Sequence, residues 1–272
     1  MSEMPDTGSV GELRRIAMGV EYDGTAYAGW QTQPHAPSVQ DALEAALSKV
    51  ADSPVSTVAA GRTDAGVHAT GQVVHFDSDR PRSCRGWVLG ANSNLPDDIS
   101  VLWAVPVSTA FHARFSALER SYRYLIVNRQ VRPALDRHRS WWLHSALDLH
   151  AMREAAAHLL GRHDFSAFRA AACQSHTAVR ELRRLNIRAD RDRVEIDCTA
   201  NAFLHHMVRN IVGSLVRVGR GEADPGWILR LLQDRDRRLA GMTAPACGLT
   251  LRGVRYPADS GVPPEGFAAS DD

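Results

Sequence analysis

Short strand-like segments alternate with amphipathic helices along the whole chain, and this alternation most constrains the fold. In the first part, a strand at 15–22 ends in the turn Asp23-Gly24, and Ser38 then opens a helix. The apolar residues of that helix recur three and four positions apart, as one helix face requires. The remaining expected elements here are strands at 55–60, 71–76 and 99–105 and a weaker helix at 84–91.

The second part of the chain repeats this mixture, without a repeat of the sequence itself. Its expected strands are 121–127, 138–143, 179–188, 193–199 and 249–255. Its expected helices are 149–160, 204–218 and 225–232. A charged turn at 190–192 joins two of the strands as an antiparallel hairpin. Strands and helices in this order predict an α+β fold on a mostly antiparallel sheet.

The charges are distributed unevenly. The chain has 32 Lys and Arg against 31 Asp and Glu, and the net charge of +1 at first argues against a nucleic-acid partner. Residues 13–255 hold all 32 bases but only 24 acids, a net charge of +8. The other acids lie in the ends 1–13 and 258–272, which we expect to be disordered. Lys49 is the only lysine, so the basic side chains are almost all guanidinium groups, which suit phosphate and bases. A G+C-rich coding sequence alone would also produce this excess of arginine.

Composition argues against several classes of protein. No stretch approaches the roughly 18 consecutive apolar residues of a membrane helix, and we expect a cytoplasmic protein. The four cysteines are widely spaced without a Cys-x-x-Cys pair, which favours reduced thiols. Adjacent residues on a helix point about 100° apart, so the pair His205-His206 is not expected to bind a metal ion.

The densest chemical signal is the loop 61–68 (GRTDAGVH) between two expected strands. Gly61 and Gly66 frame Asp64, and such a loop holds a carboxylate rigidly while another segment approaches it closely. An aspartate that only bonds its own turn is the alternative. Arg62 lies two residues before Asp64, so in an extended segment both side chains face one cleft; the alternative is a surface ion pair.

The segment 111–139 interleaves aromatic residues with seven arginines and only two acids. Such a composition is expected where charge tracks RNA and bases stack on rings. Tyr122 and Tyr124 share one face of the expected strand. The alternative is that one tyrosine belongs to the core and the arginines form a solvated face.

The expected helix at 204–218 carries an apolar stripe, which indicates burial. Arg209 lies beside this stripe, and a charge so placed needs a partner, for which Asp64 is a natural candidate. A side chain that reaches out to water is the alternative. Leu249, in the segment 247–251, by itself indicates only the start of a strand.

Taken together, these segments resemble the bacterial tRNA pseudouridine synthase A family. The resemblance spans residues 14–257 and follows the family's order of motifs. The matching segments are 22–31 (YDGTAYAGWQ), 38–40 (SVQ), 61–68 (GRTDAGVH), 94–96 (NLP), 111–116 (FHARFS), 122–124 (YRY), 165–169 (FSAFR) and 201–213 (NAFLHHMVRNIVG).

The resemblance implies a fold, a partner and a reaction. The implied fold is the pseudouridine synthase fold, with two similar α+β halves at 14–108 and 109–257 around a basic central cleft. The implied reaction isomerises uridine to pseudouridine at positions 38, 39 and 40 of the tRNA anticodon stem-loop. The resemblance also implies that the protein is a homodimer. It implies that no metal and no cofactor is needed, because the reaction only moves the base on its ribose.

The resemblance also implies a role for five residues. Asp64 matches the catalytic aspartate, and Arg209 matches the arginine paired with it. Arg62 matches the arginine that helps to extrude the target nucleotide. Tyr122 matches the tyrosine that stacks on the uracil, and Leu249 matches an apolar residue against the base.

Two other function classes remain open on the residues alone. A non-catalytic RNA-binding module would account for the basic, aromatic segment 111–139. A glycosidase would also use a carboxylate such as Asp64, but that chemistry normally needs a second acid, and none neighbours Asp64 in the sequence.

Overall fold

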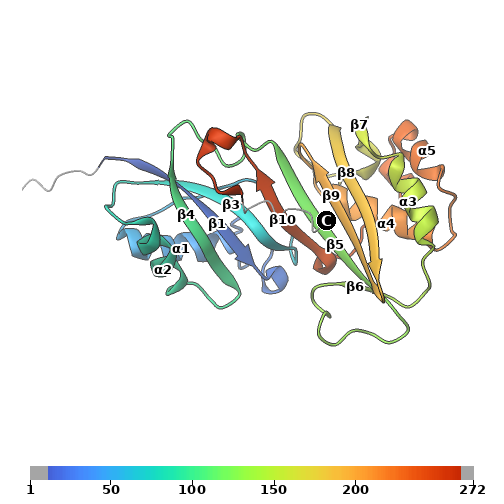
Figure 1. The fold of residues 1–272 in the computed structure, drawn as a ribbon, viewed down its shortest axis with the longest axis horizontal. Coiled ribbons are helices and arrows are strands. Elements are labelled where there is room, and N and C mark those ends of the chain that lie inside the picture. Colours follow the sequence, from blue (N-terminus) through green and yellow to red (C-terminus); the bar gives the residue numbers. More distant parts are fainter. Residues whose placement is uncertain (1–11, 265–272) are drawn as a thin grey trace, which may run out of the picture.

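A computed structural model describes residues 12–264 of the chain (Figure 1). The predicted disordered ends, 1–13 and 258–272, therefore lie largely outside the described residues. Of the second end, residues 258–264 are described and include a short 3-10 turn, Ala258–Ser260. The four cysteines are free, as the sequence predicted.

The strands form one mixed sheet of ten strands in the order β4-β1-β3-β10-β5-β9-β8-β7, with β2 on β3 and β6 on β5. The strands of the first part are β1 (Arg14–Tyr22), β2 (Val58–Ala59), β3 (His68–Ser78) and β4 (Ile99–Val107). The later strands are β5 (Glu119–Asn128), β6 (Trp141–Leu143), β7 (Gly161–Asp164), β8 (Val179–Asp190), β9 (Arg193–Ala200) and β10 (Leu249–Arg255).

Most pairings in the sheet are antiparallel, and the predicted α+β fold is confirmed. The two parallel pairings are β3 with β10 and β5 with β6. The last strand, β10, lies between β3 and β5 and joins the earlier strands to the later ones. The boundary predicted after residue 108 falls between β4 and β5, and the division into two halves stays a prediction because one sheet spans both.

The helices form two groups along the sheet (Figure 1). The first group is α1 (Val39–Ala51) and α2 (Cys84–Asn92), and the second is α3 (Leu149–Ala157), α4 (Met207–Gly219) and α5 (Trp227–Asp234). The side chains of Ser38 and Asp148 cap α1 and α3, respectively, by accepting hydrogen bonds from backbone N–H groups of the first turn. These caps explain why the two helices begin there. Within residues 12–264, none of the helices has the length and apolar character that crossing a membrane requires.

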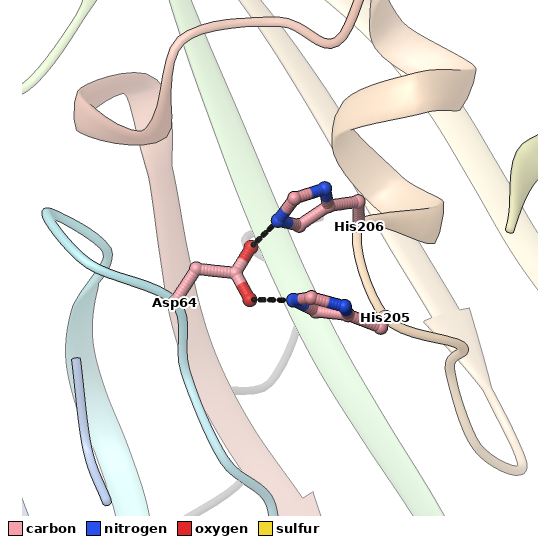
Figure 2. A group of neighbouring side chains, drawn as sticks. All are labelled: Asp64, His205 and His206. Atoms are coloured by element: carbon pink, nitrogen blue, oxygen red, sulfur yellow. Dashed lines mark ion pairs between the residues drawn. The ribbon is translucent and has the colours of Figure 1, made fainter. Parts of the chain in front are cut away.

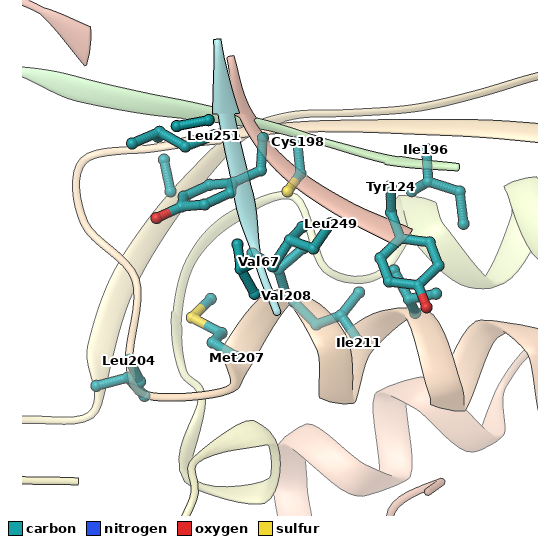
Figure 3. Packing of buried hydrophobic residues seen from close by; sticks show 14 of the residues in the cluster. Val67, Tyr124, Ile196, Cys198, Leu204, Met207, Val208, Ile211, Leu249 and Leu251 are labelled. Carbon is teal, nitrogen blue, oxygen red and sulfur yellow. The ribbon is translucent and has the colours of Figure 1, made fainter. Parts of the chain in front are cut away.

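Buried apolar side chains form two clusters on opposite faces of the sheet. In β1, Met18 and Val20 belong to the larger cluster and Ala17 to the smaller one, because alternate residues of a strand face opposite sides. The larger cluster includes the contact of α4 with β5 and β10, which Figure 3 shows around Leu249 and Ile211. This packing fixes the start of α4 close to the loop that precedes β3.

Several elements differ from the sequence prediction, among them the strand expected at 138–143, which is reduced to β6. The helix expected from residue 204 begins at Met207, because His206 has a left-handed backbone (φ 62°, ψ 4°) that a helix cannot contain. The strand expected at 55–60 is reduced to β2. The strand β7 was not predicted, because its sequence, Gly-Arg-His-Asp, has no apolar alternation.

Candidate active site

Asp64 lies in the loop between β2 and β3, against the segment that precedes α1. The backbone carbonyl of Thr63 accepts a hydrogen bond from the Trp30 N–H at 3.0 Å. Gly29 permits this approach: its φ is +106°, and a Cβ there would lie 2.6 Å from the Thr63 carbonyl oxygen. Gly29 therefore holds the loop in place, whereas a Cβ at Gly61, which the sequence reasoning emphasised, would meet nothing within 4 Å.

The predicted ion pair between Asp64 and Arg209 is present. Arg209 Nη1 donates to Asp64 Oδ2 at 2.9 Å, and Arg209 Nε donates to the Ala244 carbonyl oxygen at 2.8 Å. The two side chains are only 21% and 15% exposed, for Asp64 and Arg209 respectively. The alternative, in which Arg209 reaches out to water, is wrong, because the first turn of α4 directs the guanidinium to the loop.

Two histidines that the sequence reasoning set aside also face Asp64 (Figure 2). His205 Nε2 lies 3.3 Å from Asp64 Oδ1, and His206 Nε2 lies 3.4 Å from Asp64 Oδ2. Burial lowers the pKa of His206, which favours its neutral form at neutral pH.

The two histidines do converge, contrary to the prediction, because they precede the helix instead of lying on it. The helix begins at Met207, the backbone of His206 is left-handed, and the two ring centroids lie 4.0 Å apart. The three ligand atoms of Asp64, His205 and His206 lie within 4.8 Å of one another, so this group could hold a metal ion. The sequence feature that could have indicated this convergence is the position of the two histidines just before the helix that carries Arg209.

Tyr122 and Leu249 lie on neighbouring strands beside this loop. Leu251 of β10 is opposite Tyr122 of β5, and Leu249 is buried against α4 (Figure 3). The Tyr122 ring meets Phe203 edge to face, with centroids 5.1 Å apart. Burial raises the pKa of Tyr122, and the negative charge of Asp64 adds to this effect.

The other tyrosine of this strand, Tyr124, belongs to the core. It is fully buried, and its hydroxyl donates to the Pro245 carbonyl oxygen at 2.8 Å. The alternative that one of the two tyrosines is structural is thus confirmed for Tyr124.

Arg62 is exposed, and the structure does not pair it with Asp64. Within the described part of the chain, its side chain makes no hydrogen bond and no ion pair. The arginine that forms an ion pair with Asp64 is instead Arg209, which lies 145 residues further along the chain. That Arg62 and Asp64 serve one cleft stays a prediction.

The structure sorts the arginines of the segment 111–139 into different environments. Arg123, Arg129 and Arg139 form ion pairs with acids of other segments. Arg114 lies over the ring of Phe115, which is 76% exposed and stacks on a neighbouring histidine. Cations and an exposed ring therefore do lie together, as RNA contact would require.

Arg120 has a structural role that the sequence did not indicate. Its partly buried guanidinium donates to the carbonyl oxygens of Ala60, Arg114, Ala117 and Asn201. It thereby ties the start of the Asp64 loop to the segment that leads to His205, and burial lowers the pKa of the guanidinium.

Known proteins similar to this chain share one description. A family profile described as tRNA pseudouridine synthase matches residues 18–116 and 155–257, which include Asp64 and Arg209 but not Tyr122. tRNA pseudouridine synthase A of Vibrio campbellii is 55% identical over 249 residues, covering 92% of this chain and 94% of that protein. The proteins of the same name from Xanthomonas oryzae and Alcanivorax borkumensis are 54% and 52% identical, covering 92% and 93% of this chain and 98% and 95% of those proteins.

Proposed function

Because the chain belongs to the tRNA pseudouridine synthase family, an isomerase family, we propose that it converts uridine to pseudouridine at positions 38, 39 and 40 of the tRNA anticodon stem-loop. Asp64 is the catalytic carboxylate and acts on a flipped-out nucleotide. The observation that carries this assignment is the state of its two oxygens. Arg209 holds Oδ2, whereas Oδ1 accepts no hydrogen bond from any residue in 12–264.

The proposed reaction needs one ionised carboxylate and no oxidant or reductant. The bond from C1′ of the ribose to N1 of uracil breaks, the base turns, and C5 bonds to C1′. N1 gains a proton and C5 loses one, so the composition of the nucleotide is unchanged. Asp64 enters either as the nucleophile at C1′ or as the base that takes the proton from C2′, and an Oδ1 that accepts no hydrogen bond in the described structure suits both routes.

Arg209 acts as the residue that orients Asp64. Two of its nitrogens are committed, one to the carboxylate and one to the Ala244 carbonyl oxygen, so the guanidinium holds Oδ2 in a fixed direction. Fixing one oxygen aims the other at the substrate before it binds, which reduces the reorganisation that the reaction requires.

The target uridine has to leave the base stack before Asp64 reaches it. Extrusion costs a few kcal/mol, and stacking on an aromatic ring returns about 1–3 kcal/mol. Tyr122, whose pKa is raised by burial and further by the charge of Asp64, is the ring we assign to this stacking, with Leu249 as the apolar contact to the base. Arg62, exposed and without a partner in the described structure, fills the space that the nucleotide leaves.

We place the enzyme in the cytoplasm, where its tRNA substrate is processed, and propose that it acts as a homodimer. The homodimer is supported by the resemblance of the motifs at 22–31 and 201–213 to the family. Sedimentation of the full chain should give a mass near twice 29.8 kDa. A monomer at all protein concentrations would contradict this part of the proposal.

The function is tested with tRNA that carries a tritium label at C5 of uridine. The wild-type chain should release tritium, and mapping should place pseudouridine at positions 38–40. The variant Asp64→Asn should bind tRNA but release no tritium above background. Binding by the wild-type chain without any release would favour the non-catalytic RNA-binding module instead.

A further inference from the structure

Two imidazole rings and one carboxylate converge at the start of α4 (Figure 2). The Nε2 atoms of His205 and His206 lie 3.3 and 3.4 Å from the two oxygens of Asp64. In the described structure, neither approach forms a hydrogen bond of ordinary geometry. The two ring nitrogens thus lie at ion-pair distance from the carboxylate without a hydrogen bond to it.

Each of the two nitrogen–oxygen distances, which run to different oxygens of Asp64, is close to the spacing of two ligands in a tetrahedral metal site. Zinc binds histidine nitrogen at about 2.0–2.1 Å and carboxylate oxygen at about 2.0–2.2 Å, so two ligands of one tetrahedral ion are about 3.3 Å apart. The three ligand atoms already lie within 4.8 Å of one another. Two imidazoles with one carboxylate suit Zn²⁺ or Co²⁺, whereas Mg²⁺ and Ca²⁺ prefer oxygen ligands.

We propose that Asp64, His205 and His206 form a binding site for a zinc-type divalent ion, and that this ion inhibits the enzyme by occupying the catalytic carboxylate. Three protein ligands leave the fourth position to water, and the partial exposure of both histidines provides an entry path. Metal binding rests on the ligand geometry alone, whereas inhibition also rests on the function proposed above.

The charges around the site make the ion an inhibitor of moderate affinity. Arg209 bonds to Asp64 Oδ2 at 2.9 Å, and its positive charge opposes a cation at the same carboxylate. The described structure provides no hydrogen-bond partner for the second ring nitrogen of either histidine, and such support is commonly worth about 10–100-fold in affinity. Removing the charge with Arg209→Met should therefore tighten metal binding.

The binding test uses the metal-stripped full chain and Co²⁺, whose visible absorption is intense only in a tetrahedral site. Wild type should develop this absorption, and Zn²⁺ should remove it. His205→Asn and His206→Asn should each weaken binding about 10-fold or more. The exposed His150, on α3, supplies the matched control His150→Asn, which should bind as wild type does. The proposed site would be contradicted if the wild type showed no tetrahedral absorption, or if both site variants retained it.

The inhibition test measures pseudouridine formation at buffered free Zn²⁺, so that metal bound by tRNA does not alter the result. Zn²⁺ should inhibit the wild type and the His150→Asn control equally, and Mg²⁺ should not replace it. Inhibition that persists unchanged in His205→Asn and His206→Asn would contradict the mechanism. If the site variants are inactive, tighter Co²⁺ binding by Arg209→Met decides the matter, and unchanged or weaker binding would count against the site. Co²⁺ binding is scored without turnover, so the two proposals fail separately.

Discussion

Asp64 and Glu119 are two of the carboxylates that form ion pairs with arginine, and they differ in how their oxygens are bonded. Glu119 on β5 is 11% exposed and has both oxygens bonded, by Arg183 and by Arg255. Asp64 is 21% exposed; Arg209 donates a hydrogen bond to its Oδ2, whereas its Oδ1 accepts no hydrogen bond in the described structure and has only the His205 ring nitrogen at ion-pair distance, 3.3 Å. An acid whose oxygens are all bonded stabilises a fold, and an acid with one oxygen left open can react.

The partners of the two acids also come from different kinds of element. Arg183 and Arg255 lie on strands: Arg183 on β8, at the irregularity in its pairing with β9, and Arg255 on β10, directly opposite Glu119 of β5. His205, by contrast, comes from the irregular segment before α4, and Arg209 comes from the first turn of that helix. The residues of the proposed active site thus lie on segments that adjoin the strands, and the sheet holds these segments in position.

The largest effect should separate the two acids by activity. Asp64→Asn should lower turnover by about 10²–10⁴-fold, because it removes the reactive carboxylate, and leave the melting temperature nearly unchanged. Glu119→Gln should leave turnover per folded molecule unchanged but lower the free energy of unfolding by about 1–3 kcal/mol. Tritium release and urea unfolding of both variants measure this, and equal losses of activity would break the comparison.

The next effect should separate the two sets of partners. Arg209→Met should lower kcat by about 10²-fold, because a carboxylate that has lost its orientation misses the reacting atom. Arg255→Met should spare kcat, because Glu119 keeps Arg183 and takes no part in the reaction. Single-turnover rates at saturating tRNA measure the chemical step directly. A larger loss of kcat in Arg255→Met than in Arg209→Met would reverse the assignment.

A smaller effect should appear in the pH dependence of stability. The hydrogen bond from Arg255, with Arg183, holds the pKa of Glu119 below its ordinary value. A lowered pKa in the folded state means that this contribution is present above the ordinary glutamate pKa of about 4.3 and is lost as pH falls through the folded value. Wild type should thus lose more stability between about pH 5 and 3 than Glu119→Gln does, as urea unfolding at several pH values will reveal. Parallel curves would refute it.

The smallest effect concerns metal removal. Chelation by EDTA should leave the rate of pseudouridine formation unchanged, because the open oxygen of Asp64 and the charge of Arg209 provide what the reaction needs. Tritium release before and after dialysis against EDTA measures this. A rate that falls and is restored by Zn²⁺ would make the metal a cofactor rather than the inhibitor inferred here.

The regular elements could be predicted because their signals are local. The helix α1 follows from the spacing of its apolar residues and from the cap at Ser38, and the β8–β9 hairpin follows from alternation around a charged turn. The partnership of Arg209 with Asp64 could be inferred because a charge beside an apolar stripe requires a counter-charge. Each of these inferences needed only a few neighbouring residues.

The remaining features depend on contacts between distant segments. The left-handed backbone of His206 lies at the residue just before α4, and no rule on residue spacing reveals it. The need for glycine at position 29 appears only when the Thr63 carbonyl oxygen is placed against it. The partners of Glu119 lie 64 and 136 residues away, so the sequence alone left its ion pairs unpredicted.

The position of β10 has a consequence for how this protein acquires activity during synthesis. The strand is the last of the sheet to leave the ribosome, yet it lies between β3 and β5, next to the strand that follows Asp64. A nascent chain that ends before residue 249 can form the earlier strands but lacks the strand that links them to the later ones. Isomerase activity should therefore arise only after β10 has been translated, and chains truncated before this strand should be inactive.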